Sequence, residues 1–355
     1  MASRLLPIVT LIAVAAAPPA VAQSVERISL ETTVAIDVFR GDNAVDRPNI
    51  VVDITGTARL GGGWQLFLRP WFRQPRVNNW DKQIYQAFVR YERQGPVSVR
   101  VDTGYLGSPI GLALGDSSPV INPTIAGHSS YFAPMLPFDT GGPRVSAISS
   151  TYPLGSQLTV SGDRWDARAA VVSTTPTRIY TIGGSPDPHH TPVFEAGGGI
   201  TPYIGTRFGV SFARGAYLTS GEITAAGSDD RMVTMMGVEG EFAFRYTKIS
   251  GEFVRDHFDT PSGTLPASEW FIQGTQTLTP RLFAAARYEG VTSPVRTVVP
   301  TFKSQPQQKV TEATVGFRLT SDILLRGSYL RRLSYGRHTW DEQGGFQAVW
   351  ARRWW

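Results

Sequence analysis

Apolar and polar residues alternate with a period of two along almost the whole chain, and this alternation restricts the chain to β-structure. In the run from Ile50 to Leu60, every second residue is apolar or small, and Asp53, Thr55 and Arg59 stand between them. About sixteen or seventeen such runs follow one another, separated by Gly, Pro, Asn or Asp. No stretch sustains the period of an amphipathic helix with capping residues at its ends. The sequence therefore predicts an all-β protein.

One apolar face per strand fits either a soluble β-protein or a transmembrane antiparallel β-barrel. Three features favour the barrel: more than 300 residues without a domain break, aromatic residues near strand ends, and connections of very unequal length. A sheet in hydrocarbon must close, because no water can satisfy an open edge. Bacterial single-chain barrels have even strand numbers. We therefore expect sixteen strands, with eighteen as the alternative.

Composition excludes several classes of site and partner. The chain has no cysteine, which excludes disulfides, thiolate metal sites and cysteine nucleophiles. Four lysines and thirty arginines are scattered singly, whereas nucleic-acid binders usually carry clusters of basic residues. We expect no cofactor and no nucleic-acid partner.

The first residues have the pattern of a cleaved signal peptide. Arg4 supplies the positive charge, Leu5–Ala17 the short apolar segment, and Ala20-Val21-Ala22 the small-residue cleavage site. The alternative is a membrane anchor, but a spanning helix needs roughly 20 apolar residues. We expect residues 1–22 to be removed on export and residues 23–355 to form one barrel domain.

Basic residues repeatedly occupy the polar face of the predicted strands. A polar face that lines a water-filled lumen keeps such side chains charged, and rings of arginine bias a pore towards anions. The alternative is that the arginines pair with acidic residues of the same wall. The predicted pore-lining residues are Arg59, Arg69, Arg73, Arg90, Arg100, Arg168, Arg207, Arg287, Arg318 and Arg326.

Residues 107–143 form the longest early stretch without strand alternation. Loops beyond about 15 residues in compact proteins are usually functional or disordered. This stretch contains many apolar residues, and a loop folded into the lumen would cover them. We expect it to narrow the lumen, with Asp116 and Asp139 facing Arg69, Arg90 or Arg100; the alternative is an extracellular cap.

Other polar motifs predict no enzyme site. His189 and His190 are two adjacent ligand types where a closed metal site needs about four. His128-Ser129-Ser130 lacks a Gly-x-Ser-x-Gly elbow. The glycine triplets 61–63 and 197–199 lack a following helix or Lys-Ser/Thr pair, so we expect turns or close approaches between strands.

Four passages together resemble the Gram-negative outer-membrane porins, and most of all the sixteen-stranded porins that include the phosphate-selective group. They are Val99–Gly111, Ile249–Asp256, the hairpin Trp270–Tyr288 and the aromatic end Phe346–Trp355. The resemblance implies a channel in the outer membrane that passes small hydrophilic solutes, with outer-membrane lipid around it. It also implies a homotrimer and recognition of the last strand by the barrel assembly machinery. A weak preference for anions is expected; the alternatives are a substrate-selective porin for phosphate or another anion, a barrel enzyme, and a non-conducting structural barrel.

Overall fold

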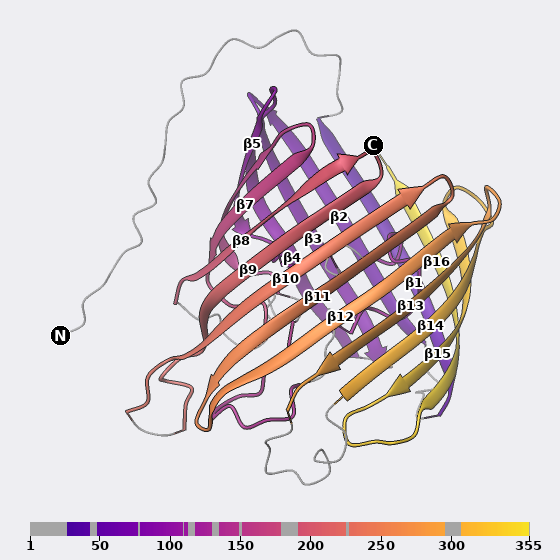
Figure 1. Cartoon of the computed structure of the whole chain (residues 1–355). Helices are drawn as coiled ribbons and strands as arrows, with labels where there is room; N and C mark the ends of the chain where they lie inside the picture. The colour runs from indigo at the N-terminus through magenta and orange to yellow at the C-terminus, as the bar shows by residue number, and fades with distance from the viewer. Residues whose placement is uncertain are drawn as a thin grey trace.

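Sixteen antiparallel strands form one closed barrel in the part of the chain that the computed structural model describes (Figure 1). The described residues are 27–42, 48–76, 79–108, 110–112, 118–129, 135–148, 151–178, 191–224, 227–294 and 307–354, so the predicted signal peptide lies outside them. The strands are β1 (Ile28–Gly41), β2 (Asn49–Gly61), β3 (Trp64–Arg76), β4 (Asn79–Arg93), β5 (Ser98–Tyr105), β6 (Leu154–Ser161), β7 (Trp165–Val172), β8 (Val193–Tyr203), β9 (Thr206–Leu218), β10 (Arg231–Phe244), β11 (Thr247–Thr260), β12 (Gly263–Thr277), β13 (Leu282–Thr292), β14 (Gln307–Arg318), β15 (Ile323–Leu333) and β16 (Asp341–Arg353). Among these residues, no helix is long and apolar enough to cross a bilayer.

Each strand pairs with its neighbours in sequence, and the first strand pairs with the last. The β1–β16 ladder runs from Glu31 opposite Arg353 to Gly41 opposite Gln343. This ladder gives the two terminal strands the backbone partners that an open sheet would lack. The predicted all-β barrel of sixteen strands is confirmed, and the alternative of eighteen is wrong.

The two ends of the barrel differ in their connections. At one end, which we call the turn end, hairpin turns of two to four residues join β2 to β3 and every second pair up to β14–β15. The turn between β2 and β3 is made by Gly62 and Gly63, which both have positive φ, as a tight two-residue hairpin turn requires. The opposite end, the loop end, carries connections that range from two residues to the segment 106–153. The predicted glycine turn at 61–63 is thus confirmed.

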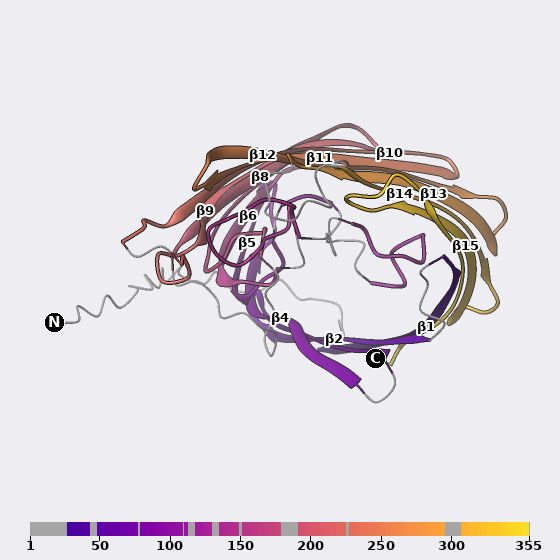
Figure 2. The same cartoon turned by 90° about the horizontal axis from the view of Figure 1, so that it is seen from below.

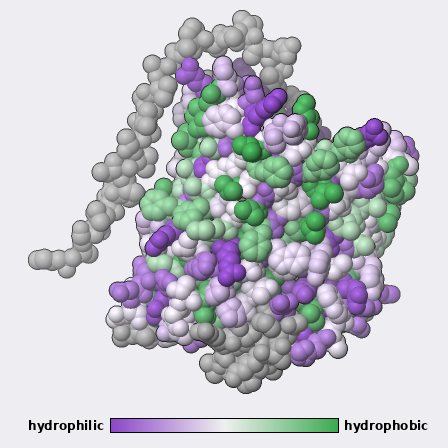
Figure 3. Space-filling view, in the orientation of Figure 1, coloured by the Kyte–Doolittle hydropathy of each residue, from purple (hydrophilic) through white to green (hydrophobic). Residues whose placement is uncertain are grey.

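The outer face of the barrel is largely apolar. Val210, Val238, Phe253 and Val315 all belong to the outward-facing rows and are exposed. Figure 3 shows hydrophobic side chains gathered across the face over β8–β12 and hydrophilic ones at its lower rim. Residues one position away point inwards, so each strand presents one face to the outside and the other to the lumen.

Alternation alone does not decide which face of the last strand points outwards. The structure places its aromatic residues on the outer face. Phe346, Trp350 and Trp354 are on the outward face, and Val349 is buried on the inward face. The indole Nε1 of Trp354 donates to Oγ1 of Thr32 at 3.1 Å, across the ladder that closes the barrel. The outward aromatic row of β16 therefore lies next to the β1–β16 ladder that closes the barrel.

One strand face differs from the alternation read from the sequence. Strict alternation along β4 would place Tyr85 in the outward row with Ala87 and Val89, but the β3–β4 register shifts between Arg69 and Pro70 and turns Tyr85 inwards. There it is buried and stacks on Trp71 and on Tyr152, with ring centroids 4.8 Å and 4.5 Å apart. A bulge inserts one residue and reverses the faces beyond it, and the alternation of residue types does not reveal where it lies.

The described residues of the long connection between β5 and β6 lie inside the barrel. This connection spans residues 106–153, ten residues more at its C-terminal end than the predicted 107–143. Figure 2, which views the barrel along its axis, shows its purple and magenta trace inside the ring of strands. Leu136 and Phe138 of this loop are buried against Tyr217 of β9 and Phe258 of β11. The prediction that the early loop enters the lumen is confirmed, and the extracellular cap is wrong.

The alternation of faces predicts a position-dependent cost of an outward charge. Val238→Arg, in the middle of β10, should destabilise the barrel in lipid vesicles by about 2–4 kcal/mol, because the outer face meets hydrocarbon there. Tyr203→Arg, at the turn end, should cost at most about 1 kcal/mol. Urea unfolding followed by tryptophan fluorescence measures both, and equal costs would contradict the assignment of the outer face.

Candidate functional site

All ten arginines named from the sequence belong to inward-facing rows of the barrel wall. Their surroundings divide them into three groups. Five line a large cavity beside the loop, two are covered by the loop, and three lie elsewhere along the lumen. The five cavity residues, which we call the arginine arc, are Arg69, Arg90, Arg100, Arg168 and Arg207.

The arginine arc borders a cavity of about 630 Å³ between the wall and the start of the loop. The arc comes from β3, β4, β5, β7 and β9, and the loop contributes Leu106, Ser108 and Leu112. A second cavity of about 420 Å³ lies on the side of β1–β3 and β16. The two cavities share Arg69 and Gln86. The lumen beside the loop is therefore polar, with arginines along one wall.

The arc is neutralised in large part by carboxylates of the same wall. Arg69 makes a bidentate pair with Asp53, at 2.9 Å and 2.7 Å. Arg90 makes a second with Asp102, at 2.7 Å and 3.1 Å, and Nε of Arg100 lies 3.3 Å from the same carboxylate. Planar pairs of this kind hold the guanidinium in a fixed orientation.

The far end of the arc is held in the same way. Arg207 bonds Asp166, at 3.1 Å and 3.2 Å, and also Glu239, while Arg168 lies 3.7 Å from Glu239. The arc thus consists of wall-bound ion pairs, so its net field is much smaller than five isolated cations would give.

Glycines make room for the far end of the arc. An added Cβ at Gly197 would lie 2.9 Å from Nε of Arg168, and one at Gly199 would lie 2.7 Å from Nη2 of Arg207. Both glycines face inwards on β8, so the two arginines lie flat across that strand. The triplet 197–199 is a close approach between strand and side chain, which is one of the two expectations from the sequence.

Carboxylates of the opposite wall bind the backbone of the loop. The N–H groups of Ile125 and Ala126 donate to Glu312 of β14, at 2.9 Å and 3.2 Å. The N–H of Leu112 donates to Glu252 of β11. The N–H of Ile125 is buried, so Glu312 satisfies a donor that would otherwise be unpaired, and the other two bonds fix partly buried backbone to the wall.

Two arginines satisfy the carbonyl groups of the same loop segment. Arg287 donates to Oγ1 of Thr124 at 2.7 Å and to the carbonyl of Ala126 at 2.9 Å. Arg326 donates to the carbonyls of Pro119 and Thr124, at 2.6 Å and 2.9 Å. We call Glu252, Glu289, Glu312, Arg287 and Arg326 the loop anchors.

Arg287 and Arg326 therefore differ from the open pore lining expected of them. They face inwards, but each is at most 2% exposed, because the loop covers them. The polarity of the strands predicted their direction. What the sequence pattern did not reveal is that buried backbone groups of the loop need partners beyond its own side chains, and that buried charges on the wall supply them.

The remaining three arginines lie apart from the arc and the anchors. Nε of Arg73 donates to Oδ1 of Asn49 at 2.8 Å. Arg59 is exposed near the turn end of β2, and Arg318 lines a recess near the turn end of β14. These positions spread basic residues along the lumen on both sides of the loop.

The structure does not bring Asp139 to the arginines of the arc. Its Oδ1 accepts from the N–H of Gly141 at 2.9 Å, and the carbonyl of Gly141 accepts from Thr224 in the β9–β10 connection. Asp139 is thus exposed at the loop end, away from the arginines of the arc. Asp116 lies outside the described residues.

The histidine and serine of the loop do not form a nucleophile–base pair. The hydroxyl of Ser129 donates to Oε1 of Glu289 at 2.9 Å, and its N–H donates to Oε2 of Glu289. Nδ1 of His128 lies 3.5 Å from that Oε2. Both residues converge on one buried carboxylate, so the serine proton is committed to Glu289 and the contact anchors the loop.

Metal ligands and buried tyrosine hydroxyls are the remaining groups that could carry chemistry. In the described part of the chain, no group of three His, Asp or Glu side chains could hold a metal ion. His189 and His190 lie outside the described residues. At the loop end, burial raises the pKa of the Tyr335 phenol above its usual range, so this hydroxyl stays protonated.

Sequence comparison finds no relative, whereas structural comparison finds many. No family model and no curated protein matches the sequence. The outer-membrane channel DcaP of Acinetobacter baumannii is 10% identical with a TM-score of 0.58, over 92% of this chain and 96% of that one. The anion-selective porin of Comamonas acidovorans is 12% identical with a TM-score of 0.57, over 92% and 99% of the chains.

A third solved structure has the same barrel. The trimer form of OmpT, an outer-membrane protein of Vibrio cholerae, is 11% identical with a TM-score of 0.59, over 92% of this chain and 99% of that one. Identities this low show a shared fold alone. The resemblance to the sixteen-stranded outer-membrane porins therefore holds for the fold of nearly the whole chain.

Removing one loop anchor should loosen the loop without opening the barrel. Arg326→Ala leaves the buried carbonyls of Pro119 and Thr124 without their donor, which should lower the local opening free energy of residues 119–126 by about 1–3 kcal/mol. Hydrogen exchange of the loop amides, read by mass spectrometry, measures this. Arg337→Ala, which removes an exposed pair, is the control; equal exchange in both variants would contradict the anchoring role.

Filling the close approach on β8 should disturb the arc. In Gly199→Ala, the new Cβ meets Arg207 and also the carbonyl of Phe208 at 2.8 Å, so we expect a loss of about 1–3 kcal/mol from overpacking. Gly274→Ala on β12 is the matched control, because nothing lies within 4 Å of its added Cβ. Urea midpoints in detergent compare the two variants, and equal midpoints would contradict the packing argument.

Proposed function

We propose that the protein is a porin of the Gram-negative outer membrane, through which small hydrophilic solutes diffuse passively. The observation that carries the proposal is the combination of an apolar outer face with a lumen lined by charged and polar side chains beside a folded-in loop. Water and ions can fill such a polar lumen, and lipid can surround such an apolar outer face. No cofactor or energy input enters this function, and no catalytic group is assigned.

The constriction in this proposal is the passage between the loop and the arginine arc. The loop anchors hold residues 118–129 against β11–β15, which leaves the arc side of the lumen for solutes. Because the loop is bound through many buried contacts, it narrows the pore permanently instead of swinging freely.

The lining charges support a weak preference for anions. Around the larger cavity, the five arginines of the arc face five carboxylates: Asp102, Asp166, Glu239 and Glu241 line it, and Asp53 binds Arg69 from the adjoining cavity. The basic excess along the lumen comes instead from residues such as Arg318, whose recess has no acid among its described lining residues. An excess this small biases the local potential towards anions without excluding cations. A strongly selective phosphate or other anion porin is the alternative, and a reversal potential measured in a salt gradient separates the two.

Location and assembly belong to the same proposal. Removal of residues 1–22 on export would deliver residues 23–355 to the outer membrane. The outward aromatic row of β16 is the segment that we expect the barrel assembly machinery to recognise. The trimer form of the Vibrio cholerae protein supports a homotrimer here too.

A single introduced cysteine tests whether solutes pass along the arc. The chain has no cysteine, so Gln157→Cys in β6 places one thiol in the larger cavity, and Leu158→Cys places one on the outer face. A water-soluble charged methanethiosulfonate should lower the single-channel current of Gln157→Cys in planar bilayers, because the adduct occupies the lumen. The current of Leu158→Cys should not change.

Two results would contradict the proposed function. One is the absence of any conductance by the wild-type protein in potassium chloride, which would favour a structural barrel. The other is an unchanged current after complete labelling of Gln157→Cys, which mass spectrometry verifies.

A further inference from the structure

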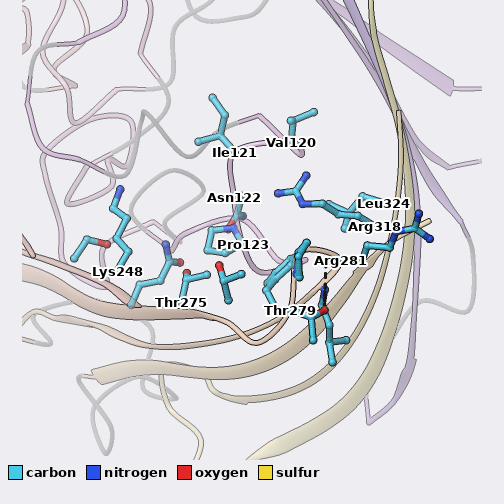
Figure 4. Close-up of a pocket in the computed structure, with 16 residues that line it drawn as sticks. Val120, Ile121, Asn122, Pro123, Lys248, Thr275, Thr279, Arg281, Arg318 and Leu324 are labelled. Carbon is cyan, nitrogen blue, oxygen red and sulfur yellow. Dashed lines mark hydrogen bonds between the residues drawn. The ribbon is translucent and has the colours of Figure 1, made fainter. Parts of the chain in front are cut away.

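A recess near the turn end differs in chemistry from the rest of the lumen. It has a volume of about 230 Å³ and lies between the loop residues 120–123 and the ends of β11–β15. In Figure 4, Val120 and Ile121 stand across the recess from Thr275 and Thr279, and Lys248 and Arg318 lie on opposite sides of it. A space of this size suits a small organic ion and is below the usual range for drug-sized ligands.

The charged residues of the recess are all basic. Lys248, Arg281 and Arg318 line it, and none of the described residues around it is acidic. Lys248 is 2.6 Å from Glu241, which faces away into the larger cavity. Among the residues that the structure describes, no carboxylate is bound to Arg281 or Arg318, in contrast to the paired arginines of the arc. The recess therefore offers net positive charge to an anion.

The loop presents apolar side chains to the same space. Ile121 is 62% exposed and Val120 is 41% exposed, although both stand inside a polar lumen. Phe283 and Leu324 line the recess from the wall. Exposed apolar surface at this place would gain free energy from contact with an apolar part of a solute.

The recess is held in shape by the loop anchors. The carbonyl of Asn122, next to Ile121, accepts from Arg326, and Thr124 is bound by Arg287. The N–H groups of Ile121 and Asn122 both donate to the carbonyl of Ser118 at 3.0 Å, which closes a turn. Since the apolar side is fixed beforehand, a solute would lose little free energy in ordering it.

We propose that this recess binds small amphipathic organic anions, in which a carboxylate meets Arg318 and an apolar body meets Val120 and Ile121. The site rests on the proposed function, because it names the class of solute that the channel would retain on its way through. Hydroxyl groups of Thr275 and Thr279 supply further donors for carboxylate oxygens. An inorganic anion uses only the basic half of the recess, and a neutral apolar solute only the other half.

Benzoate, acetate and benzyl alcohol separate the two halves experimentally. Each is added to wild-type channels in planar bilayers, and the concentration that halves the mean current is measured. Benzoate should act at a concentration about tenfold lower than acetate, and benzyl alcohol should act weakest.

Variants locate the effect. Arg318→Gln and Ile121→Ser should each raise the half-blocking concentration of benzoate by about three- to tenfold, whereas Ile121→Val should retain most of the block. Arg245→Gln is the matched charge control, because Arg245 lies in the β10–β11 turn at the same end but outside the recess. Its block by benzoate should equal that of the wild type.

Equal potency of benzoate and acetate, or an unchanged block in Arg318→Gln, would overturn the proposed binding site in the recess. Neither result would contradict the proposed channel function. Line broadening of 4-fluorobenzoate in ¹⁹F NMR, with detergent-solubilised protein, needs no current. It therefore tests the recess even if the wild-type protein fails to conduct, which would contradict the channel function alone. Broadening that Arg318→Gln and Ile121→Ser both reduce supports the site, and broadening that neither changes overturns it.

Discussion

The pairing of β1 with β16 is the interaction on which the rest of the structure depends. Without it, both terminal strands would present unpaired N–H and C=O groups, and hydrocarbon offers no partner for them. Closure in turn divides every strand into an outward and an inward face and creates an interior that a long loop can enter. The charged residues of the chain, from Arg69 to Arg326, are tolerated because this interior exists.

The division of each strand into two faces explains why the fold could be predicted from the sequence and the site only in part. Period-two alternation reports the two faces directly, so the barrel and the direction of the arginines followed from residue types. The inward turn of Tyr85 did not, because a bulge leaves no mark in the alternation. The contacts of Asp139 and of the loop anchors did not either, since they join residues far apart in sequence, such as Arg326 and Pro119.

The arginines of the lumen show how one residue type performs different tasks in one wall. In the arc, a guanidinium pairs with a carboxylate of another strand in the same wall, and Gly197 and Gly199 let Arg168 and Arg207 lie flat across β8. In the anchors, Arg287 and Arg326 exchange water for backbone carbonyls and become buried. Among the described residues, Arg318 has neither kind of partner beside it in the recess, which is why we propose that its guanidinium binds solutes.

The buried anchors and the exposed recess are therefore two consequences of one arrangement. Arg326 holds the carbonyls of Pro119, Asn122 and Thr124, and this fixes the turn that presents Ile121 to the lumen. The loop satisfies part of its backbone itself, because Asn122 binds the N–H of Thr124 and the carbonyl of Ala126. Because the wall supplies the other polar partners, the loop is free to carry valine and isoleucine at the point where they face Arg318.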